Sequence, residues 1–123
     1  GVALIIAVAA IATITAGSLM PTRQSALVLL TRPTIIAGAI ASGQVIFVHD
    51  HEKMANGEPC TTVYQSQAGE QGKKLVEFTC RPDQAARAEH FTARCARGIS
   101  APDVLVEYQF KGDTETHGVP WRP

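Results

Sequence analysis

The chain has 123 residues, and its 11 basic and 11 acidic side chains give a formal net charge of zero. This balance excludes a strongly basic face for nucleic acid and a polybasic patch for a membrane surface. The hydrophobic content of 46% is raised by an apolar start, and the roughly 100 residues that follow this start are enough for one domain.

The first element is the apolar segment at residues 2–20, which carries no charged side chain; Arg23 is the first ionised residue. As a helix the segment would be about 28 Å long, close to the hydrocarbon thickness of a bilayer. A signal peptide and a buried helix are the alternatives. The segment lacks the basic start of a signal peptide, and the rest of the chain is too short to surround such a helix. The sequence therefore predicts a transmembrane helix over residues 1–22.

Small residues recur four positions apart within this segment, in the pairs Ala3–Ala7, Ala9–Thr13 and Ala12–Ala16. In lipid, small residues at this spacing allow two helix backbones to approach closely. The alternative is that alanine is simply a common residue that favours helices. The spacing favours packing against other membrane-spanning helices.

Residues 23–43 are interpreted as a linker with the first short strand or strands, and residues 44–123 as a β domain. The clearest strand is Gln44–Asp50, which is rich in β-branched and aromatic residues. Further strands are expected at Thr61–Ser66, Leu75–Cys80, Phe91–Ala96 and Val104–Phe110, with one short helix at Pro82–Glu89. The whole pattern predicts a mainly β protein, with one N-terminal transmembrane helix followed by a small antiparallel β sandwich or open barrel and one short helix.

Cys60 and Cys80 flank the expected hairpin, and Cys95 is the third cysteine. If the hairpin turn centres near Glu70, Cys60 lies opposite Cys80, within the reach of a disulfide. Such a bridge implies an oxidising compartment, the periplasmic side of a bacterial membrane. A Cys80–Cys95 bridge and three buried free thiols are the alternatives. Cys95 is expected to be buried rather than catalytic.

Candidate metal ligands follow the strand at 44–50, and they are His49, His51, Met54 and Cys60. The two histidines are two residues apart, so they point to the same face of an extended chain. Histidine, methionine and cysteine are the ligands of a blue-copper site, which needs a second, distant histidine such as His90 or His117. Electron-transfer copper proteins cluster these ligands in one C-terminal loop, which this chain does not do. The alternative is a solvated charged loop, and no metal or other cofactor is expected.

Two carboxylates and a histidine, Asp113, Glu115 and His117, lie close together near the C-terminus. Such a group is suited to acid–base chemistry. No nucleophile motif accompanies it, and a turn stabilised by Asp113 and Gly118 explains the segment without chemistry. The sequence therefore predicts no catalytic residue.

Three segments carry a resemblance, namely His49–Cys60 (HDHEKMANGEPC), Phe78–Cys80 and Gly112–Pro120 (GDTETHGVP). They resemble small exported β proteins of soil bacteria, of acidobacterial or gemmatimonad type, and the similarity covers residues 34–120. The resemblance implies an exported β domain. It carries over no catalytic residue, because no activity is assigned to that family. The apolar start departs from the exported members, whose start would be cleaved.

The sequence predicts a non-catalytic accessory or scaffold subunit of a larger bacterial complex, placed in the inner membrane with its C-terminal domain in the periplasm. Its expected partners are integral-membrane subunits, through the helix and the domain, and the lipid bilayer. Respiratory, secretion or envelope, and photosynthetic reaction-centre–light-harvesting complexes are candidate assemblies, but the apolar segment offers no histidine to chlorophyll. One alternative is a membrane-anchored periplasmic metal or redox protein using His49, His51, Met54 and Cys60. Another is an anchored enzyme using Asp113, Glu115 and His117.

Overall fold

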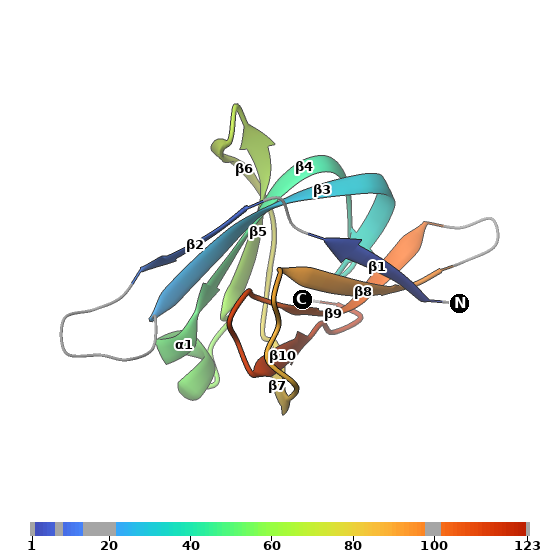
Figure 1. Cartoon of the computed structure of the whole chain (residues 1–123). Coiled ribbons are helices and arrows are strands. Elements are labelled where there is room, and N and C mark those ends of the chain that lie inside the picture. Colours follow the sequence, from blue (N-terminus) through green and yellow to red (C-terminus); the bar gives the residue numbers. More distant parts are fainter. Residues whose placement is uncertain (1, 7–8, 14–21, 98–101, 123) are drawn as a thin grey trace.

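The computed structural model describes residues 2–6, 9–13, 22–97 and 102–122 (Figure 1). Within these ranges the chain forms ten strands and one short helix. In chain order they are β1 (Val2–Ile6), β2 (Ala9–Thr13), β3 (Arg23–Ile36), β4 (Ala39–Asp50), α1 (His51–Ala55), β5 (Thr61–Gln67), β6 (Glu70–Phe78), β7 (Arg81–Gln84), β8 (Thr92–Ala96), β9 (Asp103–Gln109) and β10 (Glu115–Gly118).

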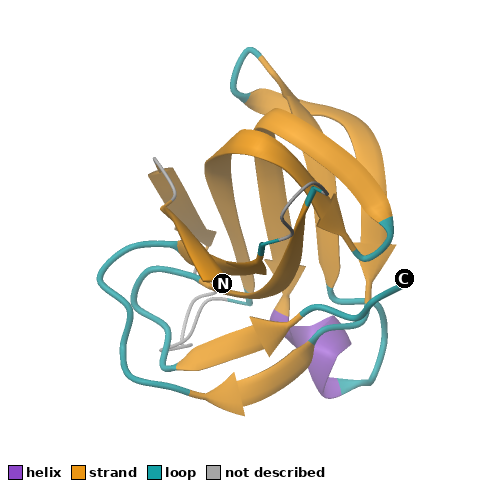
Figure 2. Ribbon diagram, turned by 90° about the vertical axis from the view of Figure 1, so that its right-hand side faces the viewer, coloured by secondary structure: helices purple, strands orange, loops and turns teal. Residues whose placement is uncertain are grey.

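The described strands form one sheet in the order β1-β8-β9-β3-β4-β5-β6, with β2 paired to β3 and β10 paired to both β7 and β9. Paired strands run antiparallel, apart from β3 and β9, which are parallel over a short stretch. The sheet curls into an open half-barrel (Figure 2). The predicted mainly β fold with one short helix is therefore confirmed.

The prediction of an N-terminal helix is wrong for the described part of that segment. β1 pairs with β8, and β2 pairs with β3. Valine, isoleucine and threonine are frequent there, and such side chains favour extended backbone. The free edges of β8 and β3 also satisfy the backbone groups that a helix would have satisfied internally. No described helix has the length and apolar character needed to cross a bilayer.

The expected helix-packing pairs are affected by the same correction. Four of their members lie in strands, namely Ala3, Ala9, Ala12 and Thr13. Because these residues lie in strands and not in a helix, the predicted packing between helices does not apply to them. The other two, Ala7 and Ala16, lie outside the described residues.

Two further expectations about local structure are corrected. Residues 23–43, interpreted as a linker with the first short strand or strands, instead form the long strand β3 and the beginning of β4, which pair along most of their length. The helix expected at Pro82–Glu89 is absent from these described residues, because Arg81–Gln84 pairs with β10. The one described helix, α1, lies instead in the expected polar loop. There Asp50 caps its first turn by accepting a hydrogen bond from the Lys53 amide at 3.1 Å.

The core lies on the inner face of the curled sheet. On β4, alternate residues Val45 and Phe47 are fully buried in it. The ring of Phe47 packs against those of Phe91 and Tyr108, with centroid distances of 5.4 and 5.2 Å. These aromatic rings fill the space between β4 and β9, and they bring β9 and its neighbour β10 close to the end of β4.

The inner face of β9 differs from simple alternation. The sequence pattern predicts that Val104, Val106, Tyr108 and Phe110 share the buried face, but the two valines are only half-buried and Leu105 is buried instead. An irregularity in the pairing with β8, between Arg94 and Cys95, changes the phase of the strand at this point. Tyr108 and Phe110 still reach the core, beyond the irregularity.

Candidate functional site

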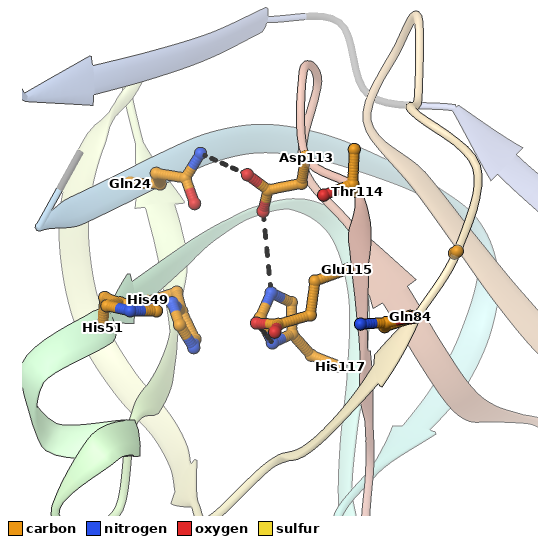
Figure 3. Close-up of a pocket in the computed structure, with 9 residues that line it drawn as sticks. Gln24, His49, His51, Gln84, Asp113, Thr114, Glu115 and His117 are labelled. Atoms are coloured by element: carbon orange, nitrogen blue, oxygen red, sulfur yellow. Dashed lines mark hydrogen bonds and ion pairs between the residues drawn. The ribbon is translucent and has the colours of Figure 1, made fainter. Parts of the chain in front are cut away.

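A polar pocket of about 350 Å³ opens at one end of the core. Three of the four histidines of the chain line it, together with two carboxylates (Figure 3). We call it the histidine pocket, and the residues used below are Gln24, His49, His51, Asp113, Glu115 and His117.

The alternation of β4 places His49 in this pocket. His49 follows Val45 and Phe47 at two-residue intervals, so its ring lies on the same inner face, and it is 1% exposed. Gln24 of β3 is paired directly with His49. The apolar inner face of these two strands therefore ends in an imidazole and an amide.

Asp113 is held in place by the turn that follows β9. Gly112 has a φ of +86°, a conformation that glycine adopts without strain, and the Asp113 amide donates to the Phe110 carbonyl at 3.1 Å. The side-chain amide of Gln109 donates to the Asp113 carbonyl at 2.8 Å. The side-chain amide of Gln24 donates to Asp113 Oδ1 at 3.3 Å. The carboxylate is thus fixed from β3 and from its own turn.

His117 lies on β10, opposite Tyr108 of β9, and is 1% exposed. Its Nε2 is 3.7 Å from Asp113 Oδ2, within ion-pair range, but has no hydrogen-bond partner among the described residues. Its Nδ1 is 4.0 Å from Glu115 Oε1. The imidazole therefore has one carboxylate beside each of its nitrogens.

The two buried imidazoles lie against each other, with ring centroids 4.2 Å apart. Burial, followed by the electrostatic interaction with neighbouring His117, lowers the pKa of His49 to about 3. His49 is therefore neutral at neutral pH, and neutral imidazole is the form that binds metal ions.

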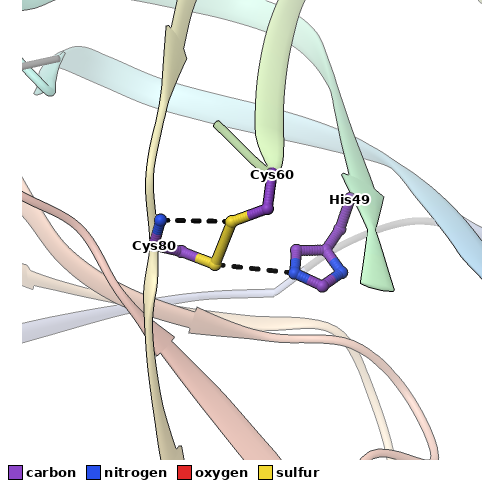
Figure 4. Close-up of side chains that lie close together, drawn as sticks. All are labelled: His49, Cys60 and Cys80. Atoms are coloured by element: carbon purple, nitrogen blue, oxygen red, sulfur yellow. Dashed lines mark hydrogen bonds between the residues drawn. A yellow bond between two sulfur atoms is a disulfide. The ribbon is translucent and has the colours of Figure 1, made fainter. Parts of the chain in front are cut away.

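A disulfide between Cys60 and Cys80 lies beside His49 and outside the pocket lining (Figure 4). Its Cα atoms are 6.3 Å apart. Cys80 Sγ lies 3.5 Å from His49 Nε2 and 3.7 Å from His117 Nδ1. The predicted Cys60–Cys80 bridge is present, and the alternatives of a Cys80–Cys95 bridge and of three free thiols are wrong.

The residues predicted as metal ligands fall into two groups. His49 and His51 line the pocket, and Cys60 lies behind His49. Met54 is on α1 and packs against the core, so it is not part of the pocket lining. His90, one of the two histidines considered as a distant ligand, is exposed and away from the pocket.

The other distant candidate, His117, joins two sets of residues that the sequence suggested separately. Two of the predicted metal ligands, His49 and His51, line the same pocket as the acid–base set of Asp113, Glu115 and His117. Gln24 is a pocket residue that no pattern in the sequence singles out. Its signal is its register opposite His49 on the neighbouring strand, which only the strand pairing reveals.

Cys95 is buried and unpaired, away from this site. Burial, followed by the negative charge of Asp103, raises its thiol pKa from 9 to about 11. We expect the native thiol to resist iodoacetamide at about pH 8.5 and to react after unfolding in urea. The unfolded thiol ionises first, so this group's contribution to stability is present below pH 9 and is lost between pH 9 and 11. Labelling of the native thiol as fast as the unfolded one would contradict this assignment.

Comparison of the chain with protein-family models, with curated proteins and with solved structures found no match. The resemblance to exported β proteins of soil bacteria therefore stays a prediction. The function is argued below from the geometry of the pocket.

Proposed function

We propose that this protein binds one first-row transition-metal ion, Zn²⁺ or Cu²⁺, beside the two buried imidazoles of the histidine pocket. His49 Nε2 and His117 Nδ1 would be its imidazole ligands, and the Glu115 carboxylate would be the third. Two histidines and one carboxylate are a common ligand set for zinc, and imidazole also suits copper.

The observation that carries this proposal is the convergence of two buried imidazoles on one point. The nitrogens of His49 and His117 lie 3.5 and 3.7 Å from the same sulfur atom, and both residues line the histidine pocket. Glu115 Oε1 is 4.0 Å from the His117 nitrogen on that side. The residues that meet here come from three segments distant in sequence, and a metal ion would satisfy donors that the protein leaves without strong partners.

Asp113 supports the same assignment from the other side of His117. Metal-binding histidines commonly direct their second nitrogen at a carboxylate, which fixes the tautomer and the ring orientation. Asp113 lies 3.7 Å from His117 Nε2 and is itself held by Gln24. A proton on Nε2, facing Asp113, leaves the lone pair on Nδ1, where the other ligands gather.

The test is calorimetric titration of the oxidised, metal-free protein with Zn²⁺, followed by Cu²⁺. We expect one ion per chain, and binding weaker by roughly 100-fold or more in His49→Gln and in His117→Gln, because each removes one of three ligands. His90→Gln is the matched control, since His90 is exposed and outside the pocket. Equal metal affinity in the pocket variants and the wild type, or loss of metal binding in His90→Gln, would contradict the proposal.

The expected role as an accessory subunit of a bacterial membrane complex stays a prediction. The same holds for its inner-membrane location, its integral-membrane partners and its lack of enzymatic activity. The pocket favours the metal-binding alternative, because His49, one of the ligands named from sequence, lies there beside His117.

A further inference from the structure

The two sulfur atoms of the disulfide lie close to buried imidazole nitrogens, so both could serve as metal ligands. His49, Cys60 and Cys80 offer ligand atoms that all lie within 4.8 Å of one another, and all three residues are buried. His117 adds a second imidazole to Cys80. The cluster of His49, Cys60, Cys80 and His117, called the cysteine–histidine cluster below, is the Cys₂His₂ set of structural zinc sites.

The spacing within this cluster agrees with tetrahedral coordination. Bond lengths of about 2.0–2.1 Å to nitrogen and 2.3 Å to sulfur give a nitrogen–sulfur separation of about 3.5 Å around one tetrahedral zinc ion. The observed separations from Cys80 Sγ are 3.5 Å to His49 and 3.7 Å to His117. Both imidazoles are thus already at ligand spacing from Cys80 Sγ.

While the disulfide bond is intact, its two sulfur atoms do not bind a metal ion as thiolates do. A sulfur in a disulfide carries no negative charge, and it is the thiolate that binds metal ions. Reduction breaks the Cys60–Cys80 bond and yields two thiols, with two electrons and two protons supplied by a dithiol that is itself oxidised to a disulfide. Binding of a divalent ion then displaces both thiol protons into solvent.

The backbone of Cys60 is held by hydrogen bonds of its own, and the Cys80 amide donates to Cys60 Sγ at 3.1 Å. The Cys60 carbonyl accepts from the Asp50 amide at 2.8 Å, and the Cys60 amide donates to the Phe78 carbonyl at 3.1 Å. These contacts tie the residue before β5 to the ends of β4 and β6. His117 is held separately by its pairing with Tyr108. Cys60 and His117 therefore keep these contacts after reduction, and the Cys80 amide still faces the Cys60 sulfur.

We infer that the disulfide masks a second coordination mode, in which reduced Cys60 and Cys80 join His49 and His117 to hold zinc or a similar thiophilic ion. The inference rests on the proposed function, because it uses the same two imidazoles. The oxidised protein offers nitrogen and oxygen ligands, and the reduced protein offers two thiolates in addition. The redox state of one bond thereby sets the affinity and the metal preference of the site.

The test is anaerobic titration of the full chain with Co²⁺, before and after reduction by a phosphine. The phosphine takes one oxygen atom from water, and the two thiols take its protons. We expect thiolate-to-cobalt charge-transfer absorption in the reduced wild type only, and Zn²⁺ bound at least roughly 100-fold more tightly than by the oxidised protein. Reduced protein without these absorption bands, or with unchanged Zn²⁺ affinity, would overturn the inference.

A Cys60→Ser, Cys80→Ser double variant should bind Zn²⁺ with the affinity of the oxidised protein, and adding the reductant should not change that affinity. Should this variant fold poorly, protection of the wild-type thiols replaces it. Zn²⁺ should then slow the alkylation of Cys60 and Cys80 in the reduced wild type, with buried Cys95 as the internal reference. Equal alkylation with and without Zn²⁺ contradicts the inference, and so does a reduced chain that unfolds and is not refolded by Zn²⁺.

The failures of the two proposals are distinguishable. Metal binding by the oxidised protein without sulfur absorption after reduction removes the masked site and leaves the proposed function. Sulfur absorption after reduction, with no metal bound by the oxidised protein, removes the nitrogen–oxygen site and leaves the cysteine–histidine cluster as a metal site.

Discussion

Replacing Phe47 by alanine is expected to lower the free energy of unfolding by about 3–5 kcal/mol. Phe47 is fully buried, and its ring packs against Phe91 and Tyr108. The substitution removes most of a large side chain from the centre of the curled sheet, and the surrounding strands can close the resulting cavity only in part. Urea-induced unfolding followed by circular dichroism measures the loss.

The same substitution should weaken metal binding, because the core supports the pocket. Phe47 precedes His49 by two residues on the same face of β4. Tyr108, its neighbour, packs against His117 with ring centroids 5.0 Å apart. Phe47→Leu is the matched control, with an expected loss of roughly 1–2 kcal/mol because more of the volume remains. A loss below about 1 kcal/mol in Phe47→Ala would show that this ring is not central to the core.

Removing the disulfide by Cys60→Ala and Cys80→Ala together should cost about 3 kcal/mol of stability. The bridge joins residues 20 positions apart, and closing a loop of about this length restricts the unfolded chain by about 3 kcal/mol. Cys95→Ala is the control for loss of a buried sulfur without loss of a cross-link. Equilibrium unfolding under oxidising conditions gives both values, and a double variant within about 1 kcal/mol of the wild type would contradict the expectation.

The metal proposals add a second consequence to the disulfide prediction. Reduced wild-type protein should lose a similar amount of stability, and Zn²⁺ at 100 times its dissociation constant should restore about 2.7 kcal/mol. The double alanine variant lacks the thiolates, so Zn²⁺ should stabilise it less than it stabilises the reduced wild type. Equal stabilisation of the two proteins would indicate that the sulfurs take no part in binding.

Local patterns in the sequence predicted much of the sheet. The β-branched run at Gln44–Asp50 became the second half of β4, and the strand expected at Thr61–Ser66 became β5. The expected hairpin, formed by β5 and β6, also brought Cys60 and Cys80 together. The predicted register is one residue off, because Thr61 pairs with Phe78 and two irregularities interrupt the pairing. These features depend on neighbours in the chain, which is why they could be found without a structure.

The wrong predictions concern segments whose state is decided by distant partners. By hydropathy alone, an uncharged apolar segment is equally compatible with a membrane helix and with a strand. β1 and β2 are strands because they pair with the edges of β8 and β3. Residues 82–84 belong to a strand because β10 pairs with them. No local pattern contains that information.

The site was predictable in parts but not as a whole. The alternation Val45, Phe47, His49 is a signal that His49 faces the core rather than solvent, and it was readable from the sequence. The group of Asp113, Glu115 and His117 was also visible. The pairing of β10 with β9 and the packing of Tyr108 on Phe47 join them, and the second of these contacts spans a long stretch of the chain.

The most direct test of metal binding in the histidine pocket is anomalous X-ray diffraction at the zinc edge from crystals of the oxidised protein grown with Zn²⁺. We expect one strong anomalous peak per chain, about 2.0–2.1 Å from a nitrogen of His49 and from a nitrogen of His117. A peak confined to exposed groups such as His90, or no peak between the two buried imidazoles, would contradict the account.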